Sequence, residues 1–254
     1  MIDPLSPQEH IRYSRQIMLP AFGEKGQNQL KRASIFVAGL GGLGSISAYY
    51  LAAAGVGRLK IVDKDNVGLE NLNRQILHGT RDIGRSKTDS AVEKLHALNP
   101  LCRIDAVKAE IRKDNVSKLL SDCHIIVDAT DNIETRKHLN SVSVTNHIPF
   151  IYGGIDGFTG MVTTLVPGDT PCLECLFPKT VSTTRQVGVM GPIPGMIGAI
   201  QSLEAIKICL GMNDLLKNTL LYINGMDMRI KKLKLERDPD CRCCGNLTHV
   251  RNNG

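Results

Sequence analysis

Two pairs of cysteines have the spacing of a metal site. Cys172 and Cys175 form one C-x-x-C motif, and Cys241 and Cys244 form a second one near the C-terminal end. Two thiolates from one such turn can bind the same tetrahedral ion, so two pairs complete a closed four-cysteine site. Such a site leaves no open coordination position, and we therefore predict structural zinc. Cys243 is the alternative to Cys244, which we prefer because it keeps the two-residue spacing.

The remaining cysteines show no metal-binding spacing. Cys102, Cys123 and Cys209 are isolated and lie in apolar or helical contexts, so we predict core thiols. A redox role for the C-x-x-C motifs is the alternative to zinc, but neither motif has the placement that is typical of thioredoxin-like proteins.

A glycine-rich turn provides the second chemical signal. Gly39, Gly41 and Gly44 fit G-x-G-x-x-G between a predicted strand and a predicted helix. Glycines at this place permit a tight turn and let phosphates approach the helix N-terminus, where free N–H groups favour anions. Asp63 ends the next predicted strand, where a carboxylate can accept hydrogen bonds from ribose hydroxyls. The pattern predicts nucleotide binding; the alternative is a turn needed only for packing.

Polar residues after Asp63 favour ATP over NAD. Asn71, Arg74 and Gln75 lie in the following loop, and Lys87 begins the next predicted helix. Two cations near a phosphate site suit a triphosphate and its developing negative charge. Asp131 follows a later strand, at the sheet edge where ligands bind, and is a plausible Mg²⁺ ligand.

The elements that position these residues alternate between strand and helix. Alternation of this kind predicts an α/β fold, a Rossmann-like, doubly wound and mostly parallel sheet with helices on both faces. After Gly153 the pattern changes to a C-terminal antiparallel extension with the zinc site. The expected strands are 34–38, 58–62, 104–109, 124–127, 149–152, 161–166, 220–223 and 228–235, and the expected helices are 45–54, 88–98, 114–120, 133–147 and 199–210.

We predict a single domain over residues 1–254. It comprises a helical lead-in at 1–33, a nucleotide-binding core at 34–152 and a lobe at 153–254. Within the lobe, 178–191 is predicted to be a mobile loop. The helix at 199–210 is predicted to be amphipathic, with one apolar face made of Ile200, Leu203, Ile206 and Leu210.

Composition limits the classes of function. The formal net charge of +6 is a mild excess that suits an enzyme of phosphate chemistry and does not indicate nucleic acid. The absence of Trp argues against a base-stacking platform. The uncharged stretch at 187–200 is shorter than the ~20 residues that span a bilayer, and no secretory signal is evident. We therefore expect a cytoplasmic protein that binds neither membrane nor nucleic acid.

In their order, the motifs resemble those of the MoeB/ThiF/HesA family, the bacterial and archaeal relatives of ubiquitin-activating enzymes. The resemblance extends over nearly the whole chain. It includes Arg12-Tyr13-Ser14-Arg15-Gln16, the glycine turn, Asp63 to Val67, Asn71 to Gln75, Lys87, Asp128 to Asn132 and both cysteine pairs.

The resemblance implies a homodimeric adenylyltransferase that uses ATP and Mg²⁺. Its expected substrate is the C-terminal Gly-Gly carboxylate of a ubiquitin-like sulfur carrier protein, contacted by the 153–254 lobe. The family pattern implies that Gly42 lies against the nucleotide and that Asp63 binds the ribose. It assigns Asn71, Arg74 and Lys87 to the phosphates, Asp131 to Mg²⁺ and Arg15 to the partner subunit's site. Gln75 and Asn132 complete the predicted nucleotide contacts.

One departure from the family pattern bears on the mechanism. Thr184 stands where relatives that form a thioester or persulfide carry a cysteine. A hydroxyl with a high pKa and no base beside it is a poor nucleophile, so we predict adenylation without a covalent enzyme intermediate. A small-molecule carboxylate such as guanylylpyridinol, or a peptide terminus, is the alternative substrate. An NAD-dependent oxidoreductase and a non-catalytic zinc-containing scaffold are the alternative classes.

Overall fold

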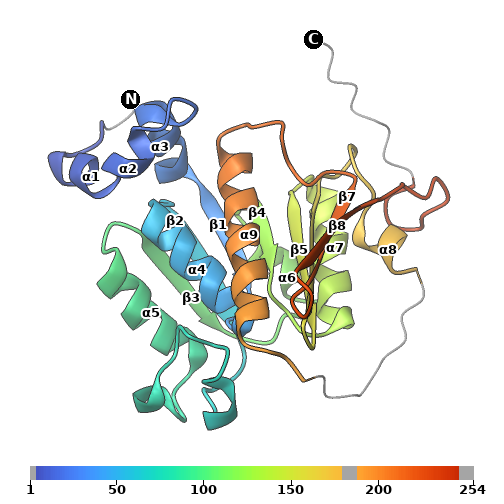
Figure 1. Cartoon of the computed structure of the whole chain (residues 1–254), viewed down its shortest axis with the longest axis horizontal. Coiled ribbons are helices and arrows are strands. Elements are labelled where there is room, and N and C mark those ends of the chain that lie inside the picture. The colour runs from blue at the N-terminus through green and yellow to red at the C-terminus, as the bar shows by residue number, and fades with distance from the viewer. Residues whose placement is uncertain (1–3, 179–187, 246–254) are drawn as a thin grey trace.

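The sheet of the protein has a parallel half and an antiparallel half. The computed structural model describes residues 4–178 and 188–245, and its strands follow the order β3-β2-β1-β4-β5-β6-β7-β8 (Figure 1). Strands β3 to β5 of this order are parallel, and the last three are antiparallel, which confirms the predicted fold class. The strands are β1 Ser34–Ala38, β2 Arg58–Asp63, β3 Arg103–Lys108, β4 Ile125–Asp128, β5 Phe150–Asp156, β6 Thr159–Leu165, β7 Thr219–Asn224 and β8 Arg229–Lys234.

Helices cover both faces of the sheet. One face packs against α3, α4, α5 and α9, and the other packs against α6, α7 and α8 (Figure 1). Among the described residues, the helices are α1 Pro7–Arg12, α2 Ser14–Ile17, α3 Gly23–Arg32, α4 Gly42–Ala54, α5 Lys87–Leu98, α6 Val116–Leu119, α7 Ile133–Asn146, α8 Leu173–Leu176 and α9 Pro192–Cys209; the 3₁₀ turns are η1 Leu69–Asn71 and η2 Thr80–Asp82.

Strand β1 lies at the centre of the core and shows why the sheet needs two helical layers. All five of its residues are buried. Ile35 and Val37 belong to the cluster on the α4 face, while Phe36 and Ala38 belong to the cluster on the α7 face. Because successive side chains of a strand point to opposite faces, a strand that is apolar throughout is buried on both sides.

Helix α9 begins earlier than predicted, and its buried face differs in part from the predicted one. It starts at Pro192, not at residue 199, and Leu203 is 55% exposed. The buried side is lined instead by Ile197, Gln201 and Ala205. The predicted apolar face was partly right, because Ile200 and Ile206 pack against the core. It was wrong at Leu203, because the helix also buries the polar Gln201 and Glu204, whose side chains bind strand and loop groups.

Strand β5 extends past its predicted end at residue 152. It runs to Asp156 and pairs with β6 in an antiparallel hairpin, from Phe150↔Leu165 to Asp156↔Thr159. The predicted nucleotide-binding core (34–152) and the predicted lobe (153–254) therefore contribute strands to one sheet. The predicted mobile loop at 178–191 lies mostly outside the described residues, as does Thr184. Within the described ranges, no helix is both long and apolar enough to cross a membrane.

The first turn of α4 has no room for a side chain at Gly44. A Cβ there would lie 1.9 Å from the Gly39 carbonyl oxygen, which is backbone and cannot rotate away. At Gly41 the nearest atom to a Cβ is Gln75 Nε2 at 3.8 Å. We expect Gly44→Ala to lower the free energy of unfolding by about 2–4 kcal/mol, measured by urea denaturation.

The matched control for this prediction is Gly41→Ala. It should cost no more than about 1 kcal/mol, because its Cβ meets only ordinary contacts. Equal losses of stability in the two variants would show that the turn is not limited by the space at Gly44.

Candidate nucleotide-binding active site and zinc site

The glycine turn joins the ends of three parallel strands. Gly39 follows β1 with φ of +90°, and a Cβ on it would lie 2.7 Å from the Ala129 carbonyl oxygen beyond β4. Its N–H donates to the Val62 carbonyl of β2 at 2.8 Å. Since only glycine combines this φ with so close a backbone contact, the turn is fixed at the carboxyl ends of β1, β2 and β4.

Asp63, at the end of β2, stabilises the turn by accepting two backbone hydrogen bonds. Its Oδ2 accepts a hydrogen bond from Leu40 N at 2.7 Å, and its Oδ1 accepts one from Asp65 N at 2.8 Å. Burial raises the pKa of Asp63, while the nearby Lys87 cation opposes that rise. Each carboxylate oxygen still has a free lone pair, so Asp63 can accept from ribose hydroxyls as the sequence predicts.

Cationic and amide groups lie on the neighbouring wall. Lys87 begins α5, has a side chain only 7% exposed and lies with Nζ 3.3 Å from Asp65 Oδ2. Arg74 donates through Nη1 to the Glu70 carbonyl at 2.9 Å, and Gln75 has a buried Oε1 without a hydrogen-bond partner. A buried lysine with one exposed counter-ion and an unsatisfied amide are groups that a bound phosphate or nucleotide can complete.

The loop after β4 supplies the acidic side. Asp131 and Asn132 are both exposed at the pocket. Asn132 is also the N-cap of α7, because its Oδ1 accepts from Thr135 N at 2.8 Å. Asp131 has no such structural bond among the described contacts, so its carboxylate is available to a cation.

These loops surround one pocket of about 750 Å³. The volume is in the range of small-ligand sites. The structure brings most of the predicted nucleotide-binding residues to its wall: Gly39, Gly41, Gly42, Asp63, Arg74, Gln75, Lys87, Asp131 and Asn132.

Three predicted site residues do not line this pocket. Gly44 packs inside the turn, and Asn71 is buried, with Oδ1 accepting from Gly68 N and Nδ2 donating to Glu70 Oε1. Arg15 is exposed on α2, away from the pocket wall. Direct roles for Asn71 and Arg15 stay predictions.

Residues that the sequence analysis missed form the far wall. Arg136 and Tyr152 are among them, and the Arg136 guanidinium is 4.9 Å from the centre of the Tyr152 ring. The rest of this wall comes from the β5–β6 hairpin and residue 189, and includes Gly154, Ile155, Met161 and Val189. A signal was present for Arg136: a cation in the first turns of a helix opposes the helix dipole and needs a special reason.

The loop that carries Arg74 and Gln75 is anchored by Asp82. Its carboxylate accepts from Gly79 N at 2.7 Å, forms an ion pair with Lys94 of α5 and another with Arg85 at 3.0 Å. Burial acts to raise the pKa of Asp82, but the hydrogen bonds from Lys94 and Gly79 outweigh it and lower the pKa to about 2. The loop is thereby connected to α5, the helix that begins at Lys87.

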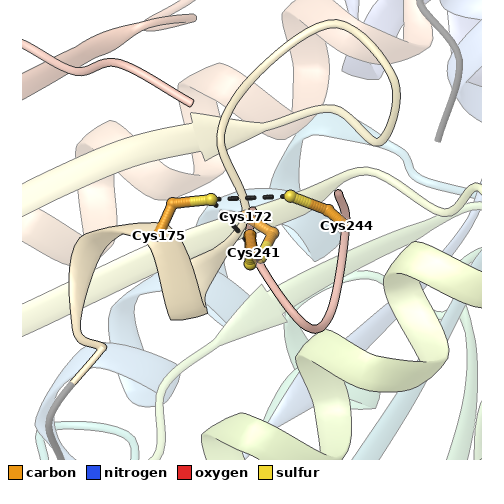
Figure 2. Close-up of side chains that lie close together, drawn as sticks. All are labelled: Cys172, Cys175, Cys241 and Cys244. Carbon is orange, nitrogen blue, oxygen red and sulfur yellow. Dashed lines mark hydrogen bonds between the residues drawn. The ribbon is translucent and has the colours of Figure 1, made fainter. Parts of the chain in front are cut away.

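The four predicted zinc ligands converge on one point. Figure 2 shows the Sγ atoms of Cys172, Cys175, Cys241 and Cys244 facing one another, all within 4.8 Å. The Sγ–Sγ distances are 4.0 Å for Cys172–Cys175, 3.7 Å for Cys172–Cys241 and 3.5 Å for Cys175–Cys244. A tetrahedral ion with Zn–S bonds of ~2.3 Å separates its sulfur atoms by ~3.8 Å, so these residues fit zinc.

Cys243 lies outside this group of four. Its Sγ accepts from Asn140 Nδ2 at 3.2 Å, while Asn140 Oδ1 accepts from Leu173 N at 2.9 Å. Cys244 is therefore the fourth thiol of the geometric cluster, and its role as a zinc ligand stays a prediction. The isolated Cys102 and Cys123 are buried, and the partly exposed Cys209 packs against the core.

A parallel sheet with a glycine turn, an acid at the end of the second strand and cations around one pocket is typical of a nucleotide-binding α/β enzyme. The chain belongs to the ThiF family, whose sequence model matches residues 13–243. The predicted enzyme class, adenylyltransferase, is confirmed by the relatives described next.

Three relatives are similar over nearly their whole length. The SAMP-activating enzyme E1 of Haloferax volcanii is 41% identical over 92% of this chain and 88% of that protein. The sulfur carrier protein adenylyltransferase of Thermus thermophilus is 39% identical, over 94% and 92%. The molybdopterin-synthase adenylyltransferase of Salmonella typhimurium is 38% identical, over 95% and 98%.

A solved structure shows the same fold. The crystal structure of E. coli MccB with ATP superposes with a TM-score of 0.83 at 24% identity, covering 92% of this chain and 74% of that one. At this identity the likeness concerns the fold alone.

Asp82 should make stability depend on pH. Its pKa is lower in the folded chain (about 2) than its ordinary 3.8, so its stabilisation is complete above about pH 5 and is lost as the pH falls toward 2. We expect Asp82→Asn to lower the free energy of unfolding by about 1–2 kcal/mol at pH 7. The difference from wild type should shrink between pH 5 and pH 2 in urea denaturation.

The control is Glu93→Gln, which removes an exposed partner of the same Arg85. An exposed pair contributes about 0–1 kcal/mol, so this variant should resemble the wild type. A constant difference between Asp82→Asn and wild type from pH 7 to pH 2 would contradict the assignment.

The zinc site gives a second test with its own internal control. We expect about one zinc per chain by elemental analysis. Cys244→Ser should lose the metal and lower the thermal midpoint by about 5–10 °C, because metal binding stabilises only the folded chain. Cys243→Ser should keep the metal, since that thiol is outside the cluster. Loss of zinc from both variants, or from neither, would refute the ligand set.

Proposed function

We propose that the protein binds Mg-ATP in the pocket and adenylates the C-terminal Gly-Gly carboxylate of a ubiquitin-like sulfur carrier protein. The observation that carries this proposal is the pocket itself, which combines two kinds of wall. One wall has the ribose-binding Asp63 and the cations Arg74 and Lys87, and the other is formed by the β5–β6 hairpin with few charges. A triphosphate suits the first wall and an extended, uncharged peptide end suits the second.

The reaction needs alignment more than proton transfer. An ionised carboxylate oxygen attacks the α-phosphorus of ATP, a new P–O bond forms, and the bond to the β-phosphate oxygen breaks as pyrophosphate leaves. The attacking group is already deprotonated at neutral pH, so no general base is required. Lys87 and Arg74 stabilise charge on the phosphates, and Asp63 fixes the ribose.

Asp131 is the residue that would bind Mg²⁺. It is exposed and lines the same pocket as Arg74 and Lys87. When bound, the ion neutralises phosphate charge and orients the leaving group. The donor set fits a hard cation, because carboxylate oxygens are the ligands that Mg²⁺ prefers.

The names of the relatives support the substrate class. Those from Thermus thermophilus and Salmonella typhimurium are named for adenylating a sulfur carrier protein and molybdopterin synthase. A Gly-Gly tail has no side chains and no charge before its carboxylate, which suits the uncharged lining residues Gly154, Ile155 and Met161. A small-molecule carboxylate is the alternative that the same pocket could accept.

We also propose a homodimer in which Arg15 reaches the partner subunit's pocket. The lead-in is firmly attached to its own subunit: Tyr13 is buried and its hydroxyl accepts from Asn99 Nδ2 at 2.9 Å. Gln16 Nε2 donates to Gln27 Oε1 at 2.8 Å and to the Ala54 carbonyl at 3.0 Å. Arg15 lies between these two anchors and is exposed. A cation held outward in this way suits a contact with another molecule.

The carboxylate is proposed to leave as the acyl-adenylate, with no thioester to the enzyme. This step rests on Thr184, which lies outside the described residues and carries no thiol. The zinc is proposed to be structural, because four cysteines leave no open position for a substrate.

Pyrophosphate exchange tests the proposed function directly. With Mg²⁺ and a Gly-Gly-ended carrier protein, the wild type should exchange labelled pyrophosphate into ATP. Lys87→Ala should lower the rate about 100-fold or more, because it removes a buried cation from the phosphate wall. Lys113→Ala, a change at an exposed lysine that does not line the pocket, is the matched control and should keep the wild-type rate.

Different outcomes separate the alternatives. Exchange that depends on the carrier and stops when its terminal Gly-Gly is removed supports the proposal. Exchange only with a small pyridinol carboxylate would favour the alternative substrate. ATP binding without exchange for either would indicate a binding protein, and NAD binding without any effect of Mg-ATP would indicate an oxidoreductase.

A further inference from the structure

Strands β4 and β5 separate next to the pocket. Their parallel pairing covers only Ile126↔Phe150 and Val127↔Ile151. Beyond these pairs β4 and β5 no longer pair with each other, although β4 still pairs with β1 and β5 still pairs with β6. Residues that follow on each side line the pocket, so the gap between the two strand ends is part of the site.

Gln201 bridges this gap from the α9 face. Its Nε2 donates to the Asp128 carbonyl at 2.7 Å and to the Ile151 carbonyl at 3.1 Å. The side chain is fully buried. It therefore satisfies one carbonyl of each strand at the point where their ladder stops.

Arg136 bridges the same gap from the opposite face, because it lies on α7 (Figure 1). Its Nη2 donates to the Thr130 carbonyl at 2.6 Å and to the Gly153 carbonyl at 2.8 Å. Its Nε lies 3.0 Å from Asp128 Oδ2, an ion pair without an aligned hydrogen bond. One guanidinium thus connects the loop after β4, the middle of β5 and a carboxylate.

Together, Asp128 and Arg136 bind every polar group of Thr130. Asp128 Oδ1 accepts from the Thr130 N–H at 3.0 Å and from its hydroxyl at 2.6 Å. The Thr130 carbonyl accepts from Arg136. The next residue is Asp131, whose exposed carboxylate has no comparable support of its own. The conformation of Thr130 therefore sets the position of Asp131.

The stability of the fold alone does not explain the Asp128–Arg136 ion pair, because burying two charges has a desolvation cost. Asp128 is fully buried, and the Arg136 side chain is 14% exposed. Burial raises the pKa of Asp128, and the Arg136 charge opposes that rise. A buried ion pair often adds no net stability compared with apolar residues, but it fixes geometry because each charge needs its partner. Fixed geometry is useful at the wall of a catalytic pocket, because the residues of a site must be held in productive positions.

We propose that Arg136 and Asp128 are positioning residues that hold Thr130 so that the Asp131 carboxylate faces the Mg²⁺ of bound Mg-ATP. The inference rests on the proposed function, since it takes Asp131 as the Mg²⁺ ligand. Neither residue touches the reacting atoms. Their effect passes through the backbone of one residue, Thr130, to the next.

The test is the Mg²⁺ dependence of ATP binding, measured by titration calorimetry in EDTA and at rising Mg²⁺. Arg136→Lys keeps the positive charge beside Asp128, but one ammonium group cannot reproduce the planar contacts with two carbonyls. Without Mg²⁺ it should bind ATP within about twofold of wild type. It should need about tenfold more Mg²⁺ for half of the gain in affinity, the effect typical of lost support to a metal ligand. Asp131→Asn gives the upper limit of the effect.

Gln201→Met is the matched control. It removes the other bridge between the same strand ends but does not touch Thr130. It should lower the thermal midpoint and leave the Mg²⁺ requirement unchanged. Thr130→Val keeps the ion pair and removes only the 2.6 Å hydroxyl bond, so it should shift the Mg²⁺ requirement in the same direction as Arg136→Lys, by less. This variant tests the inference even if Arg136→Lys does not fold.

Each result decides the question. A raised Mg²⁺ requirement in Arg136→Lys or Thr130→Val, with none in Gln201→Met, supports the inference. Wild-type Mg²⁺ dependence in both variants would reduce Arg136 to a structural role and overturn it while leaving the proposed function intact. If the ATP affinity of the wild type did not depend on Mg²⁺, the proposed role of Asp131 would be refuted. That result would overturn both this inference and the proposed function on which it rests.

Discussion

The pocket depends on the absence of side chains at the first turn of α4. A Cβ at Gly39 would collide with the Ala129 carbonyl, and a Cβ at Gly44 would collide with Gly39 itself. Because these atoms are in contact, the ends of β1 and β4 and the start of α4 form one rigid unit. Asp63 adds the end of β2 to that unit through the Leu40 N–H. The nucleotide-binding groups are therefore placed by backbone packing, before any ligand is present.

The change from parallel to antiparallel strands creates the other half of the site. At the outer end of the parallel half, β5 leaves β4 after two residue pairs and turns into a hairpin with β6. The carbonyls that no longer pair between β4 and β5 would destabilise the fold if they had no donor, since each buried carbonyl needs one. The protein satisfies them with two long polar side chains, Gln201 and Arg136, and leaves the gap itself open as pocket wall. The separation of β4 and β5 thus supplies both space in the pocket and the polar side chains that shape this space.

The sequence predicted the features that depend on short spacing. The glycine turn, Asp63 and the two C-x-x-C motifs are local patterns, and each has few structural solutions. The sequence did not predict Arg136 as part of the site, because its role depends on Thr130 and Gly153, and the contact with Gly153 is visible only after β4 and β5 are placed. The prediction that Leu203 lies on the buried face of helix α9 was wrong for a related reason. Its apolar period selected Leu203, whereas the buried face contains Gln201 and Glu204, which bind strand and loop groups far away in the sequence.

Helix α7 links the two sites that the sequence treats as separate. Its N-cap, Asn132, is at the pocket, and Arg136 of its second turn lines the pocket wall. Asn140, further along the same helix, binds Leu173 N and the Cys243 thiol at the zinc lobe. A zinc ion bound by the four cysteines would fix both cysteine segments and, through these contacts of Asn140, the middle of this helix. A metal bound by four cysteines would have no open position, so any influence on the pocket would pass through packing: loss of the metal would loosen the C-terminal segment and α7, and only then the pocket wall near Arg136.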